Sequence, residues 1–244
     1  MRDDFSMTPQ SAFTTTTTVA GAERVTAFLR KVYGWMFVGL GISAAVAVGV
    51  ASSEVGRAIW SNPPVYWGLF LAPFALALYM QFRADKIRPQ VAPVLFVVYS
   101  VLMGAWLSVL FLAYAGSAIA SAFVVTAGMF GAAALFGHAT RRSLAGAGHF
   151  FYMGFIGIFL ALLVSVFFRS AAENAALQFV ISVVGVIVFT GLAAWYAQNL
   201  KAMALSVPEG RAGTYAIVGA LQLYITFINL FLMLLRLFGG GRRN

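Results

Sequence analysis

The run PQVAPVLFVVYSVLMGAWLSVLFLAYAGSAIASAFVVTAGMFGAAALFGHAT, residues 89–140, decides the fold class of this chain. It contains no Asp, Glu, Lys or Arg, and such a charge at the centre of a bilayer costs about 2.5–3.5 kcal/mol on insertion scales. A membrane-spanning helix needs about 20 apolar residues. These 52 residues are too many for one helix and fit two, joined by a turn at residues 114–117 (Tyr-Ala-Gly-Ser).

Five further runs lack these charged residues, and each is long enough for one spanning helix. Hydrophobic residues make up 61% of the chain and charged residues 9%, against about 45–50% and about 25% in soluble domains. The sequence therefore predicts an all-α polytopic membrane protein with seven transmembrane helices. The five runs are residues 32–53, 58–82, 143–168, 174–200 and 212–235.

We divide the chain into three parts. Residues 1–27 are predicted to be a mobile cytoplasmic N-terminal tail, since residues up to about 22 have too little apolar content to offset the cost of ordering. Residues 28–238 form the seven-helix membrane domain, and residues 239–244 a short basic C-terminal tail. The first apolar run starts too late and is too long for the core of a signal peptide.

Lysine and arginine concentrate in alternate connections, and cytoplasmic loops are enriched in them. The N-terminus is therefore predicted to be cytoplasmic. Three arginines that follow the last run, Arg236, Arg242 and Arg243, break the pattern, so either the C-terminal tail is translocated or the last segment is re-entrant. The basic residues on the predicted cytoplasmic side are Arg2, Arg24, Arg30, Lys31, Arg83, Lys86, Arg88, Arg141, Arg142, Lys201 and Arg211.

The composition excludes several kinds of chemistry. The chain has no cysteine, and no Lys, Asp or Glu lies inside an apolar run, which excludes thiolate metal sites, a Schiff base and a carboxylate proton relay. The basic residues sit in short loops, whereas a nucleic-acid surface needs one basic face with stacking aromatics. We expect a non-enzymatic protein with no cofactor and no metal site, whose partner is the lipid bilayer and not nucleic acid.

The two histidines, His138 and His149, lie at the ends of the fourth loop beside Arg141 and Arg142. Two readings stay open for them. They are either solvated side chains near the lipid headgroups, or a loop that binds a metal or senses pH near 6.5.

Polar residues recur at helical spacing in the last two runs. Gly219, Gln222, Thr226, Asn229, Met233 and Arg236 share one face of the seventh helix, with Leu230 expected on the lipid side. A polar stripe in a membrane faces protein or water, so it serves either interhelical hydrogen bonding or a hydrated pathway. The candidate cluster comprises Tyr196, Gln198 and Asn199 of the sixth run with Gln222, Thr226 and Asn229 of the seventh.

Small residues at four-residue spacing are expected to let helix backbones approach closely. One row is Gly41, Ala45 and Gly49; the other is Gly157, Ala161 and Ser165.

Three stretches carry a resemblance to a known family: FLRKVYGWM (28–36), VFTGL (188–192) and FINLFLMLLR (227–236). With them, nearly the whole chain from about Phe28 resembles the Bax inhibitor 1 family, in particular its bacterial branch. The resemblance implies six helices around a central seventh in a bacterial cytoplasmic (inner) membrane. It also implies a pH-sensitive calcium leak, roles in stress and cell-death suppression, and links to a membrane protease and translocon quality control.

The chain departs from the family at its paired carboxylates. The family reads AYDTQ where this chain has AWYAQ (194–198), and LYLDFIN where this chain has LYITFIN (223–229). Two close carboxylates cannot both ionise easily, which raises one pKa toward neutral. Tyr196 and Thr226 replace them, and neither side-chain type titrates between pH 5 and 8.

Two functions therefore stay open. The first is a calcium or ion leak without the acidic pH gate, with the candidate cluster lining its path. The second is a non-transporting interaction module that modulates a membrane protease or translocon quality control, with the N-terminal tail as its recognition segment.

Because the chain has no cysteine, one introduced cysteine reports the side of the membrane on which it lies. We expect Ser143→Cys, beside Arg142, to resist an impermeant maleimide in intact cells, and Ser117→Cys, in the third loop, to be labelled. Labelling of the Ser143→Cys protein from outside would overturn the predicted orientation.

Overall fold

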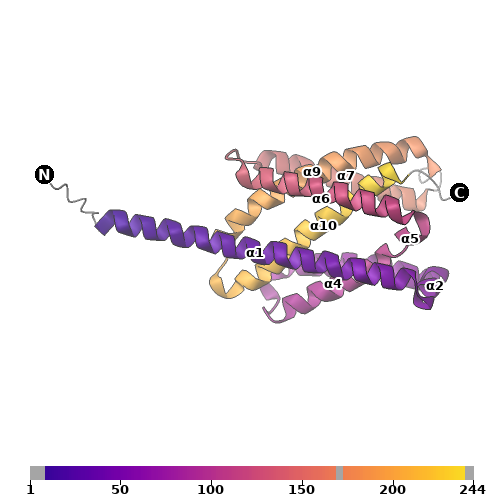
Figure 1. Ribbon diagram of the computed structural model, residues 1–244, viewed down its shortest axis with the longest axis horizontal. Coiled ribbons are helices and arrows are strands. Elements are labelled where there is room, and N and C mark those ends of the chain that lie inside the picture. The colour runs from indigo at the N-terminus through magenta and orange to yellow at the C-terminus, as the bar shows by residue number, and fades with distance from the viewer. Residues whose placement is uncertain (1–8, 169–172, 240–244) are drawn as a thin grey trace.

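The computed structural model describes residues 9–168 and 173–239, and these residues form helices and short connections without any strand (Figure 1). The long helices are α1 (Pro9–Ala51), α3 (Pro63–Phe82), α4 (Val91–Leu107), α6 (Gly116–Ala139), α7 (Ala145–Phe167), α9 (Ala175–Ser206) and α10 (Ala212–Phe238). The short ones are α2 (Glu54–Ser61), α5 (Leu110–Ala113) and the 3₁₀ helices η1 (Ala84–Lys86) and η2 (Glu209–Arg211).

Seven helices in the described ranges are long and apolar enough to span a membrane, as predicted. Residues 89–140 do contain two spans, Val91–Ala113 and Gly116–Ala139, and the chain turns between them at Tyr114 and Ala115. Helices dominate because a span in lipid must satisfy all its backbone hydrogen bonds internally. The all-α class with seven spans is confirmed.

The first helix begins inside the predicted N-terminal tail, whose mobility and cytoplasmic location stay predictions. Helix α1 begins at Pro9 and runs unbroken through residue 28, so much of the expected N-terminal tail (1–27) is helical. The spanning part of α1 is Gly21–Ala51. Residues 1–8, and residues 240–244 of the expected C-terminal tail, lie outside the described residues. A polar sequence such as the five threonines at residues 14–18 can continue a helix that the following apolar residues have already nucleated, because adding a residue costs far less than starting a helix.

Helix α10 lies in the interior. In its most apolar stretch 78% of the residues are buried, whereas the other six spans range from 11% to 33%. It packs against α1, α4, α6 and α9, while α7 packs on the outside of α9. Leu230, expected on the lipid side, is fully buried (0% exposed), so that expectation was wrong.

The last segment is not re-entrant. Helix α10 runs unbroken for 27 residues, about 40 Å at 1.5 Å per residue. In Figure 1 it crosses the bundle diagonally, from the end where α3, α6 and α9 finish to the end that carries α2, α5 and the C-terminus. The basic connections therefore gather at one end, and Arg236 lies toward the other.

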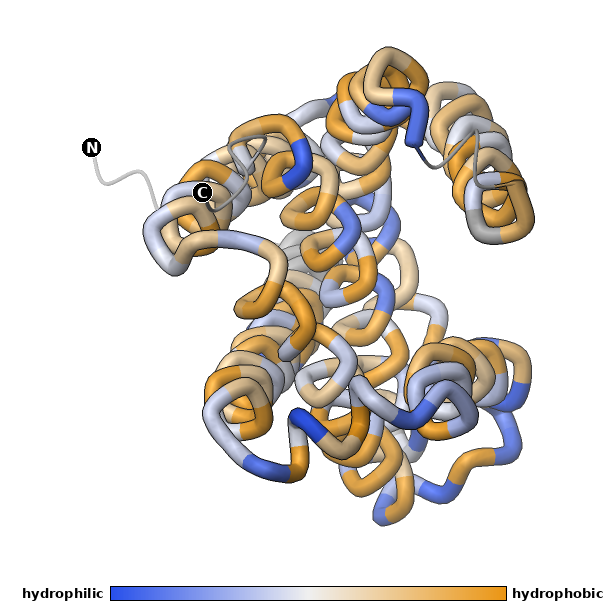
Figure 2. The backbone as a smooth tube through the Cα atoms, turned by 90° about the vertical axis from the view of Figure 1, so that its right-hand side faces the viewer, coloured by the Kyte–Doolittle hydropathy of each residue, from blue (hydrophilic) through white to orange (hydrophobic). Residues whose placement is uncertain are grey.

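The outside of the bundle is apolar. Large hydrophobic side chains are widely exposed on it, among them Phe82 (81%), Phe167 (75%) and Phe150 (71%). Hydrophobic residues run along the helices of the bundle in Figure 2. Soluble proteins rarely expose continuous apolar areas, so this surface is one that lipid covers.

The two expected rows of small residues are not where the helices meet most closely. A Cβ added at Gly41, Gly49 or Gly157 would meet nothing within 4 Å. The close approaches lie elsewhere. A Cβ at Gly104 of α4 would come within 2.6 Å of the Ser43 carbonyl oxygen of α1, and one at Gly137 of α6 within 2.1 Å of the Ala194 carbonyl oxygen of α9.

Gly137→Ala should destabilise the protein by about 1–3 kcal/mol, because the new methyl meets backbone that cannot move aside. Gly131→Ala, in the same helix, is the matched control, since nothing lies within 4 Å of its Cβ position. That change should be neutral or slightly stabilising, as alanine is the better helix former. The measurement is the apparent Tm in detergent; equal shifts for the two variants would contradict the close α6–α9 contact.

Candidate functional site

The residues of the candidate cluster have different contact partners. Gln198 bonds to the connection between α6 and α7: its Oε1 accepts from the Leu144 backbone N–H at 2.8 Å, and its Nε2 donates to the Arg142 carbonyl at 2.8 Å. Asn199 is exposed. Tyr196 is half-buried, with its ring 5.0 Å from that of Trp195. In the α9 part of the cluster, Gln198 therefore fixes a loop, and of the three residues only Asn199 is exposed.

The polar residues of α10 are bonded within their own helix. The Thr226 hydroxyl donates to the Gln222 carbonyl at 2.8 Å, and Asn229 Nδ2 donates to the Ile225 carbonyl at 2.8 Å. Thr226 is buried, and Gln222 and Asn229 are half-buried. The backbone of their own helix thus satisfies two of these side chains without a partner from another helix.

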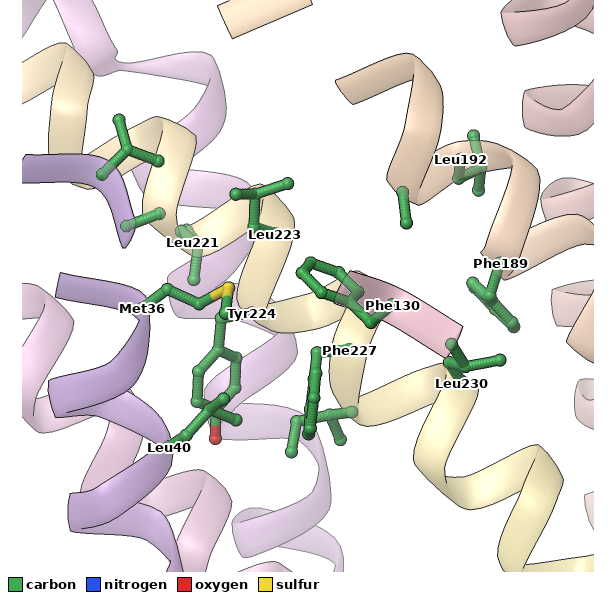
Figure 3. Packing of buried hydrophobic residues seen from close by; sticks show 14 of the residues in the cluster. Met36, Leu40, Phe130, Phe189, Leu192, Leu221, Leu223, Tyr224, Phe227 and Leu230 are labelled. Atoms are coloured by element: carbon green, nitrogen blue, oxygen red, sulfur yellow. The ribbon is translucent and has the colours of Figure 1, made fainter. Parts of the chain in front are cut away.

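A polar contact that the sequence analysis missed joins three helices. The Ser43 hydroxyl of α1 lies 2.7 Å from the Tyr224 hydroxyl of α10, and it donates to the Ser100 carbonyl of α4 at 2.7 Å. All three residues are buried, each exposed by 2% or less. Figure 3 shows Tyr224 reaching from α10 toward α1, beside Leu40. We call Ser43, Ser100 and Tyr224 the serine–tyrosine contact.

Aromatic rings surround this contact. The Tyr224 ring lies 5.3 Å from Tyr99 and 6.1 Å from Phe96, both edge to face. One turn further along α10, Phe227 meets Phe130 of α6 at 5.5 Å. These aromatic surroundings make the loss of a hydrogen-bond partner costly, because a hydroxyl buried among them cannot form a hydrogen bond to water instead.

The two histidines lie apart. His138 Nε2 lies 2.8 Å from the Tyr33 hydroxyl of α1, and its Nδ1 is buried without a hydrogen-bond partner among the described residues. His149 Nδ1 lies 2.7 Å from the Ala145 carbonyl, within α7, and its ring is 6.3 Å from that of Trp195. The two histidines thus have different partners: His138 contacts α1, and His149 contacts α9.

Three basic side chains at the basic end of the bundle donate hydrogen bonds to the ends of neighbouring helices. Arg24 donates to the carbonyl of Val207, which follows α9, and Lys201 donates to the carbonyl of His138 in the last turn of α6. Arg211 donates to the carbonyl of Asp85 in η1, just after α3. Cations are favourable there because carbonyls at a helix C-terminus carry partial negative charge.

Nothing in the described ranges resembles a metal centre. No group of three or more His, Cys, Asp or Glu residues occurs in residues 9–168 and 173–239. The carboxylates whose side chains are described, such as Glu54 and Asp85, are exposed, and among them only Glu23 lies in a long helix, near the N-terminal end of the spanning part of α1. The chemistry available inside the bundle is therefore that of hydroxyls, amides and aromatic rings.

Sequence reasoning could have found Tyr224 only in part. It stands in the segment LYITFIN that carries the family resemblance, but it is off the stripe that contains Gln222, Thr226 and Asn229. Its partners Ser43 and Ser100 are single serines in apolar runs, and serines of that kind commonly bond their own helix.

The serine–tyrosine contact predicts a non-additive pair of substitutions. Ser43→Ala removes the bonds to the Ser100 carbonyl and to the Tyr224 hydroxyl. It leaves the buried Tyr224 hydroxyl without its partner, at a cost of about 1–3 kcal/mol in the free energy of unfolding. Tyr224→Phe should cost less, near the average of about 0.6 kcal/mol for membrane hydrogen bonds, since Ser43 keeps the Ser100 carbonyl. The double variant should be no less stable in detergent than Ser43→Ala alone. Ser108→Ala, a buried serine bonded within its own turn, is the control, and additive losses in the pair would refute the contact.

Comparison with known proteins places these features in a family. The sequence model of the family described as inhibitor of apoptosis-promoting Bax1 matches residues 25–244. The inner membrane protein YbhL of Escherichia coli is 43% identical over 219 residues, which cover 88% of this chain and 92% of that protein. A protein of Borreliella burgdorferi is 39% identical, over 89% of this chain and 93% of its own. A protein of Rickettsia prowazekii is 36% identical, over 88% of this chain and 90% of that protein. The chain is thus an integral membrane protein that belongs to the Bax inhibitor 1 family.

Proposed function

We propose that this protein is a non-enzymatic ion leak of a bacterial inner membrane, held closed by α10 and lacking the acidic pH gate of its family. The location follows the relative from Escherichia coli, which is named an inner membrane protein. Calcium is the candidate ion because the family resemblance implies it. The N-terminus and the basic connections lie on the cytoplasmic side in this proposal.

The observation that carries the proposal is the polar content of the most buried helix. Tyr224 and Thr226 are buried, and Gln222 and Asn229 half-buried, on a helix enclosed by apolar neighbours. Polar residues inside a membrane are expensive and mark substrate and ion pathways by default. Their position on α10, and not on a lipid-facing helix, supports a pathway along this helix.

The same groups support a closed state. The side chains of Thr226 and Asn229 donate hydrogen bonds to carbonyls of their own helix. The serine–tyrosine contact joins α10 to α1 and α4. Opening would require α10 to shift against these two helices. That shift would expose the Tyr224 and Ser43 hydroxyls to the water that enters.

The proposed leak differs from the family pattern in its response to protons. Tyr196 and Thr226 replace the two carboxylates, so neither position changes charge between pH 5 and 8. Calcium prefers carboxylate oxygens, and a path lined by amides and hydroxyls would therefore select calcium only weakly.

A second candidate function also has an observation in its favour. Helix α1 projects well beyond the rest of the bundle on its N-terminal side (Figure 1), and such an arm suits the recognition of another protein. In this alternative the chain conducts nothing and modulates a membrane protease or translocon quality control, with roles in stress or cell-death suppression. The self-bonded amides and hydroxyls of α10 would then be structural.

Calcium flux from loaded vesicles should separate the two functions. We expect the parent protein to leak with no steep change between pH 5 and 8. Tyr196→Asp with Thr226→Asp puts carboxylates at the two positions where the resemblance implies the paired carboxylates of the family. This variant should make the flux rise several-fold with pH, since carboxylates that ionise near neutral pH attract calcium. Tyr196→Asn with Thr226→Asn is the uncharged control and should stay flat.

The outcomes of this experiment are distinct. A steep pH response in the parent protein would contradict the loss of the gate. A parent that leaks nothing at any pH, together with a silent acidic variant, would refute the leak and favour the interaction module.

A further inference from the structure

An apolar groove opens on the side of the bundle between α6, α7 and α9. Its volume is about 540 Å³, within the range of about 300–1,000 Å³ that is typical of ligand sites. Small residues create it: Ala133 of α6, Ala147 of α7 and Ala194 of α9 leave space that larger neighbours border. Those neighbours include Phe136, Phe151 and Trp195.

The groove lies within the membrane-spanning part of the protein. Nearly all of its lining residues belong to the spans Gly116–Ala139, Ala145–Ser165 and Ala175–Ser206. The lining of the groove is almost wholly apolar, so water does not occupy the groove favourably. In a bilayer the apolar groups that surround the protein are the acyl chains of lipids.

Two free cationic side chains stand at one end of this groove. Leu144, in the connection between α6 and α7, lines it, and Arg141 and Arg142 come directly before Leu144 on the same connection. Both arginines are exposed, and within the described part of the chain neither forms an ion pair. Residues 138–149 contain no acidic side chain.

This connection is fixed to the groove wall. Gln198 holds both the Arg142 carbonyl and the Leu144 backbone N–H at 2.8 Å, from a position one turn beyond Ala194 and Trp195. His149 lies against Trp195, with ring centres 6.3 Å apart. Aromatic rings of this kind are enriched at the level of lipid headgroups, which places the arginines where a headgroup phosphate would lie.

We propose that the groove binds one anionic phospholipid. An acyl chain occupies the space between α6, α7 and α9, and the headgroup phosphate pairs with Arg141 and Arg142. Basic pockets between membrane helices bind anionic headgroups in this way. The proposal is independent of ion leakage, since the groove lies on the outer side of α9 and not along α10.

The test uses the full-length protein, stripped of lipid in mild detergent. Phosphatidylglycerol and phosphatidylcholine with identical acyl chains are added, and bound lipid is measured by native mass spectrometry. We expect phosphatidylglycerol to bind roughly tenfold to thirtyfold more tightly, as two arginines near the headgroup would give. Glycerol 3-phosphate, which carries the charge but no acyl chain, should not compete with it.

Two variants separate the headgroup contact from the groove. Arg141→Gln with Arg142→Gln should bring phosphatidylglycerol down to the level of phosphatidylcholine, whereas Arg83→Gln with Arg88→Gln, on another basic connection, should not. Ala147→Trp should fill the groove and weaken both lipids. Ala120→Trp, at an exposed position of α6 outside the groove, is its control.

Three results would overturn the proposal. The first is equal binding of the two lipids to the parent protein, and the second is competition by glycerol 3-phosphate, which would mean a site for free anions. The third result comes from cross-linking and does not depend on the folding of a tryptophan variant. A phosphatidylglycerol with a diazirine in its acyl chain is expected to cross-link the parent protein on α6, α7 or α9. Cross-links confined to other helices would exclude the groove.

Discussion

The enclosure of α10 by protein is the constraint on which the rest of the structure depends. Every span must bond its own backbone in lipid, but only α10 must also present side chains to other helices on nearly all sides. Its neighbours α1, α4, α6 and α9 therefore carry the tight contacts, at Gly104 and Gly137 among others. Helices α3 and α7 stand further out and remain largely exposed.

The sequence predicted the spans well because the cost of a charge in lipid is large and local. Each of the five shorter runs without charged residues corresponds to one spanning helix, and the turn at Tyr114 and Ala115 followed from the length of residues 89–140 together with the turn-forming residues 114–117. The contacts between spans were harder to predict. Gly41 and Gly157 have the same local sequence character as Gly104 and Gly137, and only the packing of other helices decides which glycines meet a neighbour.

The bonding partners of the candidate cluster were hard to predict for a related reason. Helical spacing puts Gln222, Thr226 and Asn229 on one face of α10, but it cannot tell whether a hydroxyl or amide bonds its own helix or the next one. Thr226 and Asn229 do the former, while Ser43 and Tyr224 do the latter. Gln198 shows a third use, since its amide holds a connection that lies more than 50 residues away in sequence.

Basic residues at one end of the bundle also join its helices through hydrogen bonds. Arg24, Lys201 and Arg211 each bond a carbonyl at the end of another helix. The end of α9 is thereby tied to α1, the end of α6 to α9, and the 3₁₀ turn after α3 to η2. At the opposite end, the described side-chain bonds of residues 52–61 and 108 stay within a turn or two of their own helix, and one bond, from Gln178 Nε2 of α9 to the Ser165 hydroxyl of α7 at 3.2 Å, joins two helices. The bundle is therefore held together by more side-chain bonds between helices at its basic end. Any rearrangement of its helices should pivot about the basic end and be widest at the far end, whichever partner or ion drives it.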